Sequence, residues 1–162
     1  MKNKINYKIG IISDTHGLIR PEVLQEFKGV DMIMHAGDIG SSDVLESLES
    51  IAKVYSVRGN TDNGMFASYL PKTEVVKIGD LYLYLIHDID ELDLNPAAAG
   101  FNAVIFGHSH TPKIKEQNGI LFFNPGSAGP KRFKLPTSAG ILHVTEKSIN
   151  GELINLNKEG DT

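Results

Sequence analysis

The residues best suited to chemistry in this chain are histidines and carboxylates that follow short apolar runs. The motif Gly107-His108-Ser109-His110 comes directly after the run 103–106 (AVIF). If that run is a strand, its period of two sends both imidazoles to the same side. Such a pair is compatible with zinc, iron, nickel or manganese, and also with two solvated side chains in a turn. The pair alone leaves these alternatives open.

Four other apolar runs, at 8–13, 31–34, 53–57 and 81–86, also end in polar residues. With the run 103–106 they supply seven candidate metal ligands: Asp14, His16, Asp38, Asn60, His87, His108 and His110. The chain has no cysteine, so a metal site must use His, Asp, Glu or Asn. Seven ligands exceed the needs of one tetrahedral ion and suit two ions about 3.5 to 4 Å apart that share a carboxylate.

The first half of the chain predicts a parallel α/β sheet. A helix is expected from Pro21, with Gly29 as its stop, and another after the cap at 41–43. The helical spacing of Val44, Leu45, Leu48 and Ile51 could serve a partner surface, but a helix packing on its own sheet needs the same stripe. Strand, polar loop and helix alternate, and ligands of such sheets bind beyond the carboxyl ends of the strands.

The second half is richer in expected strands. The runs 73–78 and 81–86 flank Gly79-Asp80 and predict a hairpin, and a short helix is expected at 90–99. After the run 103–106, we expect a β meander whose strands lie at 113–116, 120–123, 139–144 and 148–156.

Composition limits the classes of function. The length of 162 residues predicts a single domain, 1–162. Apolar residues make up 41% of the chain, but they form no run of the roughly 20 residues that a membrane helix needs. A net charge of −4 argues against a stable nucleic-acid partner. The start, 1–8, is charged, and the apolar run after it is too short for a signal peptide, so we expect a cytoplasmic protein without a membrane partner.

Taken together, the motifs resemble the calcineurin-like metallophosphoesterase superfamily. The resemblance rests on Asp14-Thr15-His16, Gly37-Asp38, 59–62 (GNTD), His87 and 107–110 (GHSH). The segments 57–60 (VRGN) and 124–127 (NPGS) are most similar to small YfcE-type phosphodiesterases. The resemblance implies an α/β fold, an α-β-β-α sandwich of two packed β-sheets flanked by helices.

The resemblance also implies two divalent metal ions and a bridging hydroxide that attacks phosphorus. One ion would be held by Asp14, His16 and His110, the other by Asn60, His87 and His108, with Asp38 between them. Asp38, Asn60 and His108 are thereby the catalytic candidates. Manganese is the expected metal, with nickel, iron and zinc as alternatives.

Thr61 bears on the substrate. Many relatives have histidine at this place, after the motif asparagine, and threonine cannot act as a general acid at neutral pH. This favours a small or exposed phosphodiester, either a small molecule or a nucleotide, over a phosphomonoester. Arg58, Thr61 and Asn124 are the candidates for substrate binding, although Arg58 also fits an ordinary surface charge and Asn124 begins a turn.

Two other functions stay open: a phosphomonoesterase of the same fold, and an interaction scaffold like Vps29. All seven ligand positions are filled, which argues against a scaffold with a degraded metal site. The oligomeric state common in the family that the motifs resemble is compatible with a homodimer. Asp62 or Asp88 is expected either to accept the second N–H of a ligating histidine or to be a solvated or capping acid. His35 is expected near the cleft and His143 in a structural role.

Overall fold

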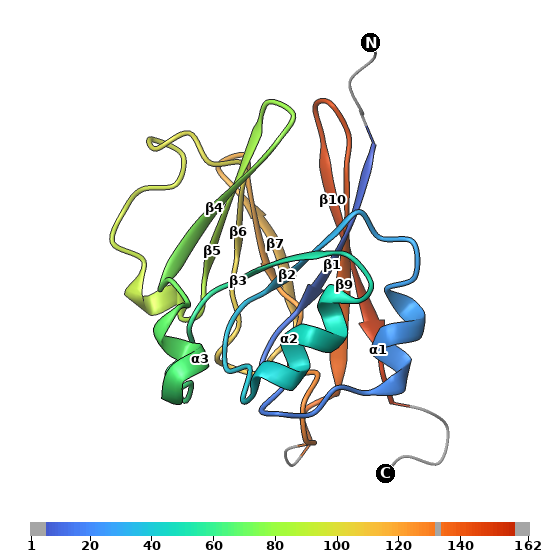
Figure 1. The fold of residues 1–162 in the computed structure, drawn as a ribbon. Helices are drawn as coiled ribbons and strands as arrows, with labels where there is room; N and C mark the ends of the chain where they lie inside the picture. Colours follow the sequence, from blue (N-terminus) through green and yellow to red (C-terminus); the bar gives the residue numbers. More distant parts are fainter. Residues whose placement is uncertain (1–5, 132–133, 158–162) are drawn as a thin grey trace.

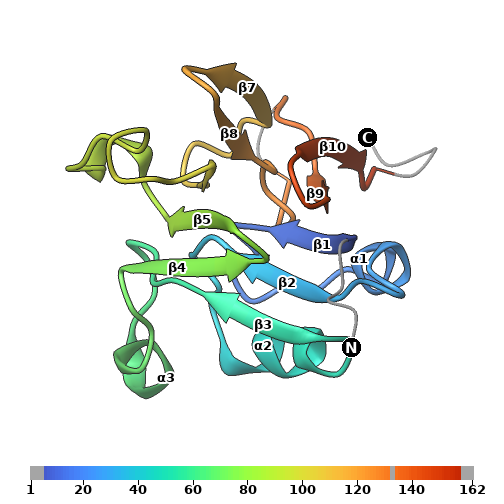
Figure 2. The same ribbon diagram turned by 90° about the horizontal axis from the view of Figure 1, so that it is seen from above.

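The computed structural model describes residues 6–131 and 134–157, which form two five-stranded β-sheets packed face to face (Figures 1 and 2). The first sheet has the order β10-β9-β1-β2-β3. Its strands are β1 (Tyr7–Ile12), β2 (Met32–His35), β3 (Lys53–Ser56), β9 (Ser138–Val144) and β10 (Ile149–Asn155). Strands β1, β2 and β3 are parallel, as predicted, and β9 pairs antiparallel with β1.

The second sheet has the order β4-β5-β6-β8-β7. Its strands are β4 (Thr73–Ile78), β5 (Leu81–Ile86), β6 (Ala103–Ile105), β7 (Lys113–Gln117) and β8 (Ile120–Asn124). Strands β5, β6 and β8 are parallel, and the hairpins β4–β5 and β7–β8 make the two edges antiparallel. The two-sheet fold that the resemblance implied is confirmed.

The prediction of one continuous β meander after residue 113 is wrong. The last four strands divide between the sheets: β7 and β8 complete the second sheet, and β9 crosses to the first sheet to lie beside β1. Strand periodicity reports which face of a strand is buried, and it carries no information about which sheet receives that face.

Alternating side chains explain how both sheets are covered. Ile9 and Ile11 of β1 face the other sheet, where Leu83 and Leu85 of β5 meet them in a core shared by the two sheets. Ile12 points the other way, into a second cluster. Each fully buried aliphatic side chain contributes about 1.5–3 kcal/mol to folding, so these two clusters fix the register of the sheets.

The outer face of the first sheet is covered by α1 (Pro21–Glu26) and α2 (Ser42–Glu49), on the side away from the second sheet in Figure 2. Val44 and Leu48 of α2 are buried there, which confirms a core role for this apolar stripe. A further short helix, α3 (Gly64–Ser68), follows β3 and had not been predicted.

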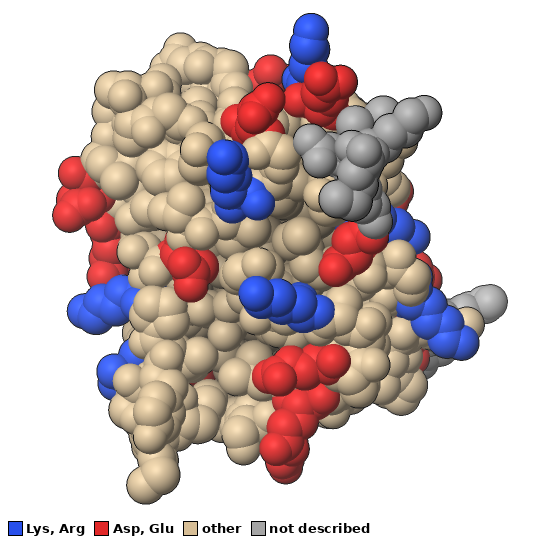
Figure 3. Space-filling view, turned by 45° about the horizontal axis from the view of Figure 1, so that its top comes forward, with Lys and Arg blue, Asp and Glu red and all other residues tan. Residues whose placement is uncertain are grey.

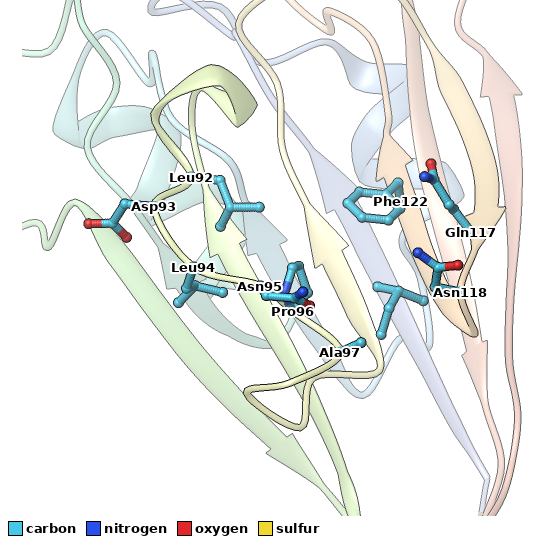
Figure 4. A pocket seen from close by; sticks show the side chains of 10 residues that line it. Leu92, Asp93, Leu94, Asn95, Pro96, Ala97, Gln117, Asn118 and Phe122 are labelled. Carbon is cyan, nitrogen blue, oxygen red and sulfur yellow. The ribbon is translucent and has the colours of Figure 1, made fainter.

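The outer face of the second sheet is covered by an irregular segment. The helix predicted at 90–99 is wrong: only a 3₁₀ turn, η1 (Ile89–Glu91), forms, and single turns follow it. Pro96 lacks an N–H and disfavours helical geometry at the residue before it. Leu92 and Leu94 instead pack against a buried cluster that includes Tyr84, beside an outer cavity of about 460 Å³ whose walls are shown in Figure 4.

Acidic and basic side chains are interspersed on the face shown in Figure 3 and do not gather into a patch of one sign. Among the described residues, no helix is long and apolar enough to span a membrane.

Candidate metal centre

The loops at the carboxyl ends of β1, β2, β5 and β6 meet at one edge of the sheets, the lower edge in Figure 1. They bring six of the seven predicted ligand side chains into one cluster. Within the cluster, ligand atoms lie within 4.8 Å of one another in two groups: Asp14, His16 and His110, and Asp38, His87 and His108. Asn60, from the loop after β3, joins the second group by the contacts described below.

In the first group, a buried carboxylate oxygen lacks a hydrogen bond. Asp14 Oδ2 accepts from the Ser13 hydroxyl (2.6 Å) and from the His108 N–H (3.1 Å), but Oδ1 has no hydrogen-bond partner among the described residues. Oδ1 instead lies 3.3 Å from His110 Nε2 and 3.9 Å from His16 Nε2, and these two nitrogens are 3.5 Å apart. Because an unsatisfied buried carboxylate oxygen is costly, this arrangement fits a bound cation.

In the second group, four potential ligand atoms face one another. The Nδ1–H of His87 donates to the Ala36 carbonyl (2.7 Å), which turns Nε2 toward Asn60 Oδ1 (3.0 Å) and Asp38 Oδ2 (3.3 Å). His108 Nδ1 lies 3.1 Å from the same Asn60 oxygen and 3.3 Å from His87 Nε2. A carbonyl that fixes one ring nitrogen and leaves the other for a ligand is the usual environment of a metal-binding histidine.

Asp38 faces both groups. Its Oδ1 accepts from the Thr61 N–H (2.9 Å), while Oδ2 lies 3.3 Å from His87 Nε2 and 3.9 Å from His16 Nε2. Burial opposes ionisation of this carboxyl, but hydrogen bonds from His87 and Thr61 outweigh burial and hold the pKa of Asp38 well below its usual range. The carboxylate is therefore ionised at neutral pH and ready to be shared by two cations.

The electrostatics at His87 run in the opposite direction. Burial disfavours the charged ring, but the hydrogen bond to Asp38 and the charges of Asp14 and Asp38 outweigh burial and raise the pKa of His87. These interactions favour the protonated form of the ring between the two carboxylates.

The ligand loops have an uncommon backbone. Among the described residues, six residues other than glycine have a positive φ, and five of the six are predicted ligands. These are Asp14 (56°), His16 (46°), Asp38 (56°), His108 (71°) and His110 (62°). A left-handed conformation at such residues costs free energy and concentrates at functional sites, where the surrounding structure enforces it.

Two glycines permit the loops to approach closely. A Cβ atom at Gly59 would overlap the backbone N and carboxylate of Asp38, and one at Gly107 would overlap the Ser13 hydroxyl and approach the Asp14 carboxylate. Both positions therefore exclude a side chain for steric reasons.

Four further polar residues were considered from the sequence, and the structure places each of them differently. Asp88 Oδ2 lies 3.7 Å from His108 Nε2, and Oδ1 of the same carboxylate caps η1 by accepting from the Asp90 N–H. Asp62 is buried and accepts from two backbone N–H groups, so it ties loops together and does not orient a histidine. His35 is buried behind the ligands, and His143 is exposed beside Glu152.

A cavity of about 640 Å³ opens beside Asn60 and His87. Arg58, a candidate for substrate binding, lines this cavity. Lys72 and Tyr84 line it too, and no sequence motif had marked them. The side chain of Thr61 is exposed next to Asn60, and its backbone N–H supports Asp38.

The structure contradicts direct substrate contact by Asn124, because its side chain is fully buried. Its amide nitrogen donates to the Gly107 carbonyl and to the Ser109 hydroxyl, both at 3.1 Å, and its oxygen accepts from the Gly126 N–H (2.8 Å). All three bonds are internal, so Asn124 holds the 107–110 loop in place and does not reach the cavity.

Comparison with known proteins agrees with this fold and cluster. Residues 7–147 match the model of the calcineurin-like phosphoesterase superfamily domain, and the chain belongs to this superfamily.

The chain is 39% identical to a probable metallophosphoesterase of Methanocaldococcus jannaschii over 90% of this chain and 80% of that protein. It is 28% identical to phosphodiesterase YfcE of Escherichia coli K12 over 83% and 86% of the two chains. The structure of Vps29 from Chaetomium thermophilum superposes with a TM-score of 0.81 at 23% identity, covering 96% of this chain and 92% of that chain, which shows a shared fold.

Proposed function

We propose that this chain is a divalent-metal-dependent phosphodiesterase. The observation that carries the proposal is the convergence of two carboxylates, one amide and four imidazoles where the carboxyl ends of strands from both sheets meet, with a buried Asp14 oxygen that lacks a donor. The membership of the superfamily and the likeness to a named phosphodiesterase support the same function.

The donor set fits two divalent ions. Asp14, His16 and His110 would hold one, Asn60, His87 and His108 the other, and Asp38 would be shared. When bound, such a pair lowers the pKa of a water between the ions and neutralises charge that develops on phosphoryl oxygens. Manganese is our first candidate, and nickel, iron and zinc accept the same donors.

The remaining tasks belong to the protein itself. The Ala36 carbonyl keeps the proton of His87 on Nδ1, and the Thr61 N–H fixes the direction of the Asp38 carboxylate. Arg58 would meet a phosphate oxygen with its guanidinium fork. Asp38, Asn60 and His108 would act as catalytic residues because they hold the reacting centre.

A diester is favoured over a monoester for two reasons. Thr61 offers no acidic side chain to protonate an alkoxide leaving group. The cavity beside Asn60 and His87 also has room for a second ester substituent, since its volume of about 640 Å³ is within the range of small-molecule sites. The substrate we infer is a small or nucleotide phosphodiester.

The fold shared with Vps29 keeps an interaction scaffold as a second candidate. A buried, unsatisfied Asp14 oxygen and five ligands with a left-handed backbone both cost free energy. A scaffold that binds no metal gains nothing to offset this cost, so the site favours the enzyme. A cytoplasmic homodimer without a nucleic-acid partner stays part of the proposal.

The test is hydrolysis of bis(p-nitrophenyl) phosphate and of p-nitrophenyl phosphate after chelation and reloading with manganese, nickel, zinc or iron. We expect diester turnover that Asp38→Asn abolishes and that Asp80→Asn, in the exposed β4–β5 turn, leaves unchanged. Absence of turnover with every metal would reject the enzyme. A scaffold would show no metal-dependent hydrolysis, and partner binding would survive Asp38→Asn.

A further inference from the structure

Behind the ligand cluster lies a chain of polar contacts centred on His35, a residue that none of the motifs includes. His35, the last residue of β2, and Thr15, in the loop after β1, are both fully buried. His35 Nε2 is 3.0 Å from Thr15 Oγ1, and His35 Nδ1 is 3.1 Å from the Gly37 nitrogen. Thr15 Oγ1 is also 2.8 Å from the carbonyl oxygen of Ile39.

The direction of every bond in this chain is determined. A backbone N–H can only donate, so the Gly37 N–H donates to His35 Nδ1. Burial lowers the pKa of His35 to about 3, so the ring is neutral at neutral pH and carries its single proton on Nε2. This Nε2–H donates to Thr15 Oγ1, and the hydroxyl of Thr15 donates in turn to the carbonyl of Ile39.

The chain encloses three predicted ligands. It starts at Gly37 and ends at Ile39, the two neighbours of Asp38, and it passes through Thr15, which stands between Asp14 and His16. These three ligands have φ values of 46° to 56°. Backbone bonds join the same loops: the Asp14 N–H donates to Gly37 and the His16 N–H donates to Asp38, both at 2.9 Å.

We propose that His35 and Thr15 are positioning residues that hold Asp14, His16 and Asp38 in the left-handed conformation needed for metal binding. The inference rests on the proposed metal centre. Neither side chain touches the ligand atoms, so both act only through the backbone of the two loops. A buried polar pair that served stability alone would be replaceable by apolar side chains of similar shape at little cost.

Two substitutions at Thr15 separate these roles. Thr15→Ser keeps the hydroxyl, and Thr15→Val keeps the branched shape and removes the hydroxyl. We expect Thr15→Ser to bind Mn²⁺ and Co²⁺ within about twofold of wild type. Thr15→Val should lose about tenfold or more in affinity, which corresponds to about 1.4 kcal/mol or more, because it leaves the Nε2–H of His35 and the Ile39 carbonyl without a partner.

The measurements are calorimetric titration of the metal-free protein and the visible absorption spectrum of the Co²⁺-loaded protein, which reports ligand geometry. Thr15→Val should change the cobalt spectrum and Thr15→Ser should not, with both variants folded by circular dichroism. As a second variant, His35→Asn retains an acceptor for the Gly37 N–H but is too short to reach Thr15. It should weaken metal binding, and combining it with Thr15→Val should add little further loss.

Wild-type affinity and an unchanged cobalt spectrum in Thr15→Val would overturn the inference, even if its thermal stability falls. Additive losses in the double variant would also overturn it, because the two residues would then act separately. If the wild-type protein itself binds neither ion, the proposed function fails and the positioning role fails with it. The two failures are therefore distinguishable.

Discussion

His87 Nε2 and the side-chain oxygen of Asn60 lie 3.0 Å apart, while the other ring nitrogen of His87 donates to the Ala36 carbonyl. An oxygen acceptor at this distance needs a proton or a cation between the two atoms. With no metal bound, a proton on Nε2 satisfies the contact, which agrees with the raised pKa of His87. Metal binding must displace that proton, so the site exchanges a proton for a cation.

Metal binding should therefore strengthen as pH rises through the pKa of His87. Below that pKa the ring is protonated and the proton competes with the ion, and above it the competition is lost. Calorimetric titration with Mn²⁺ in buffers of different ionisation enthalpy should show proton release near neutral pH. His143→Gln, at an exposed position, is the matched control and should behave as wild type. Proton uptake on binding would contradict this exchange.

Asp14→Asn should separate stability from function. The substitution removes the buried negative charge of Asp14, and Oδ1 of this carboxylate has no hydrogen-bond partner among the described residues. The metal-free protein should therefore be as stable as wild type or more stable. Thermal unfolding without and with Mn²⁺ checks this prediction. The rise in melting temperature that Mn²⁺ gives the wild type should disappear in the variant. An equal rise in both proteins would show that Asp14 does not bind the ion.

Asn124→Ala should lower kcat with little effect on KM. The buried amide fixes the Gly107 carbonyl and Ser109, and losing these bonds should cost about 1–3 kcal/mol of stability and loosen the histidine loop. Steady-state kinetics at saturating Mn²⁺, together with urea unfolding, provide the measurement. A raised KM at constant kcat would instead indicate direct contact with substrate.

Thr61→His should raise monoesterase activity relative to diesterase activity by at least about tenfold, because a positioned general acid typically contributes about 10²–10⁴. The backbone N–H that supports Asp38 is retained in this variant. The readout is the ratio of turnover on p-nitrophenyl phosphate to turnover on its diester. Thr61→Ser serves as control, and an equal ratio in the two variants would show that this position does not set the preference.

Stability should rise with pH between about 3 and 6.5 through His35. Its pKa is about 3 in the folded protein and near 6.5 when unfolded, so the unfolded chain binds the extra proton in this window. The contribution is complete above the unfolded pKa and is lost as pH falls, by at most about 1.4 kcal/mol per pH unit. Urea unfolding of metal-free wild type and His35→Gln isolates this contribution from that of His87. Parallel pH profiles would contradict it.

The sequence indicates where the candidate ligands lie because each of them follows a strand. Polar residues that end parallel strands of one sheet lie at the same end of that sheet, so the proximity of Asp14 and Asp38 follows from the apolar runs before them. Strand β4 ends and β5 begins at the predicted turn, Gly79-Asp80. Local signals decide all of these features.

Features that depend on contacts between distant segments could not be predicted in this way. The return of β9 to the side of β1, the irregular cover after η1 and the burial of Asn124 depend on what packs nearby. The bond between His35 and Thr15 joins residues 20 positions apart, and no spacing rule marks it. Lys72 lines the cavity just before β4, which packs beside β3, and no motif marks this position.

The central claim is a phosphodiesterase that needs two ions in the cluster around Asp38. Its most direct test is titration of the fully chelated protein with Mn²⁺ while hydrolysis of bis(p-nitrophenyl) phosphate is followed. The account predicts that the rate rises until about two ions are bound per chain and then levels off. A rate that reaches its plateau at one ion, or that does not respond to metal, would contradict it.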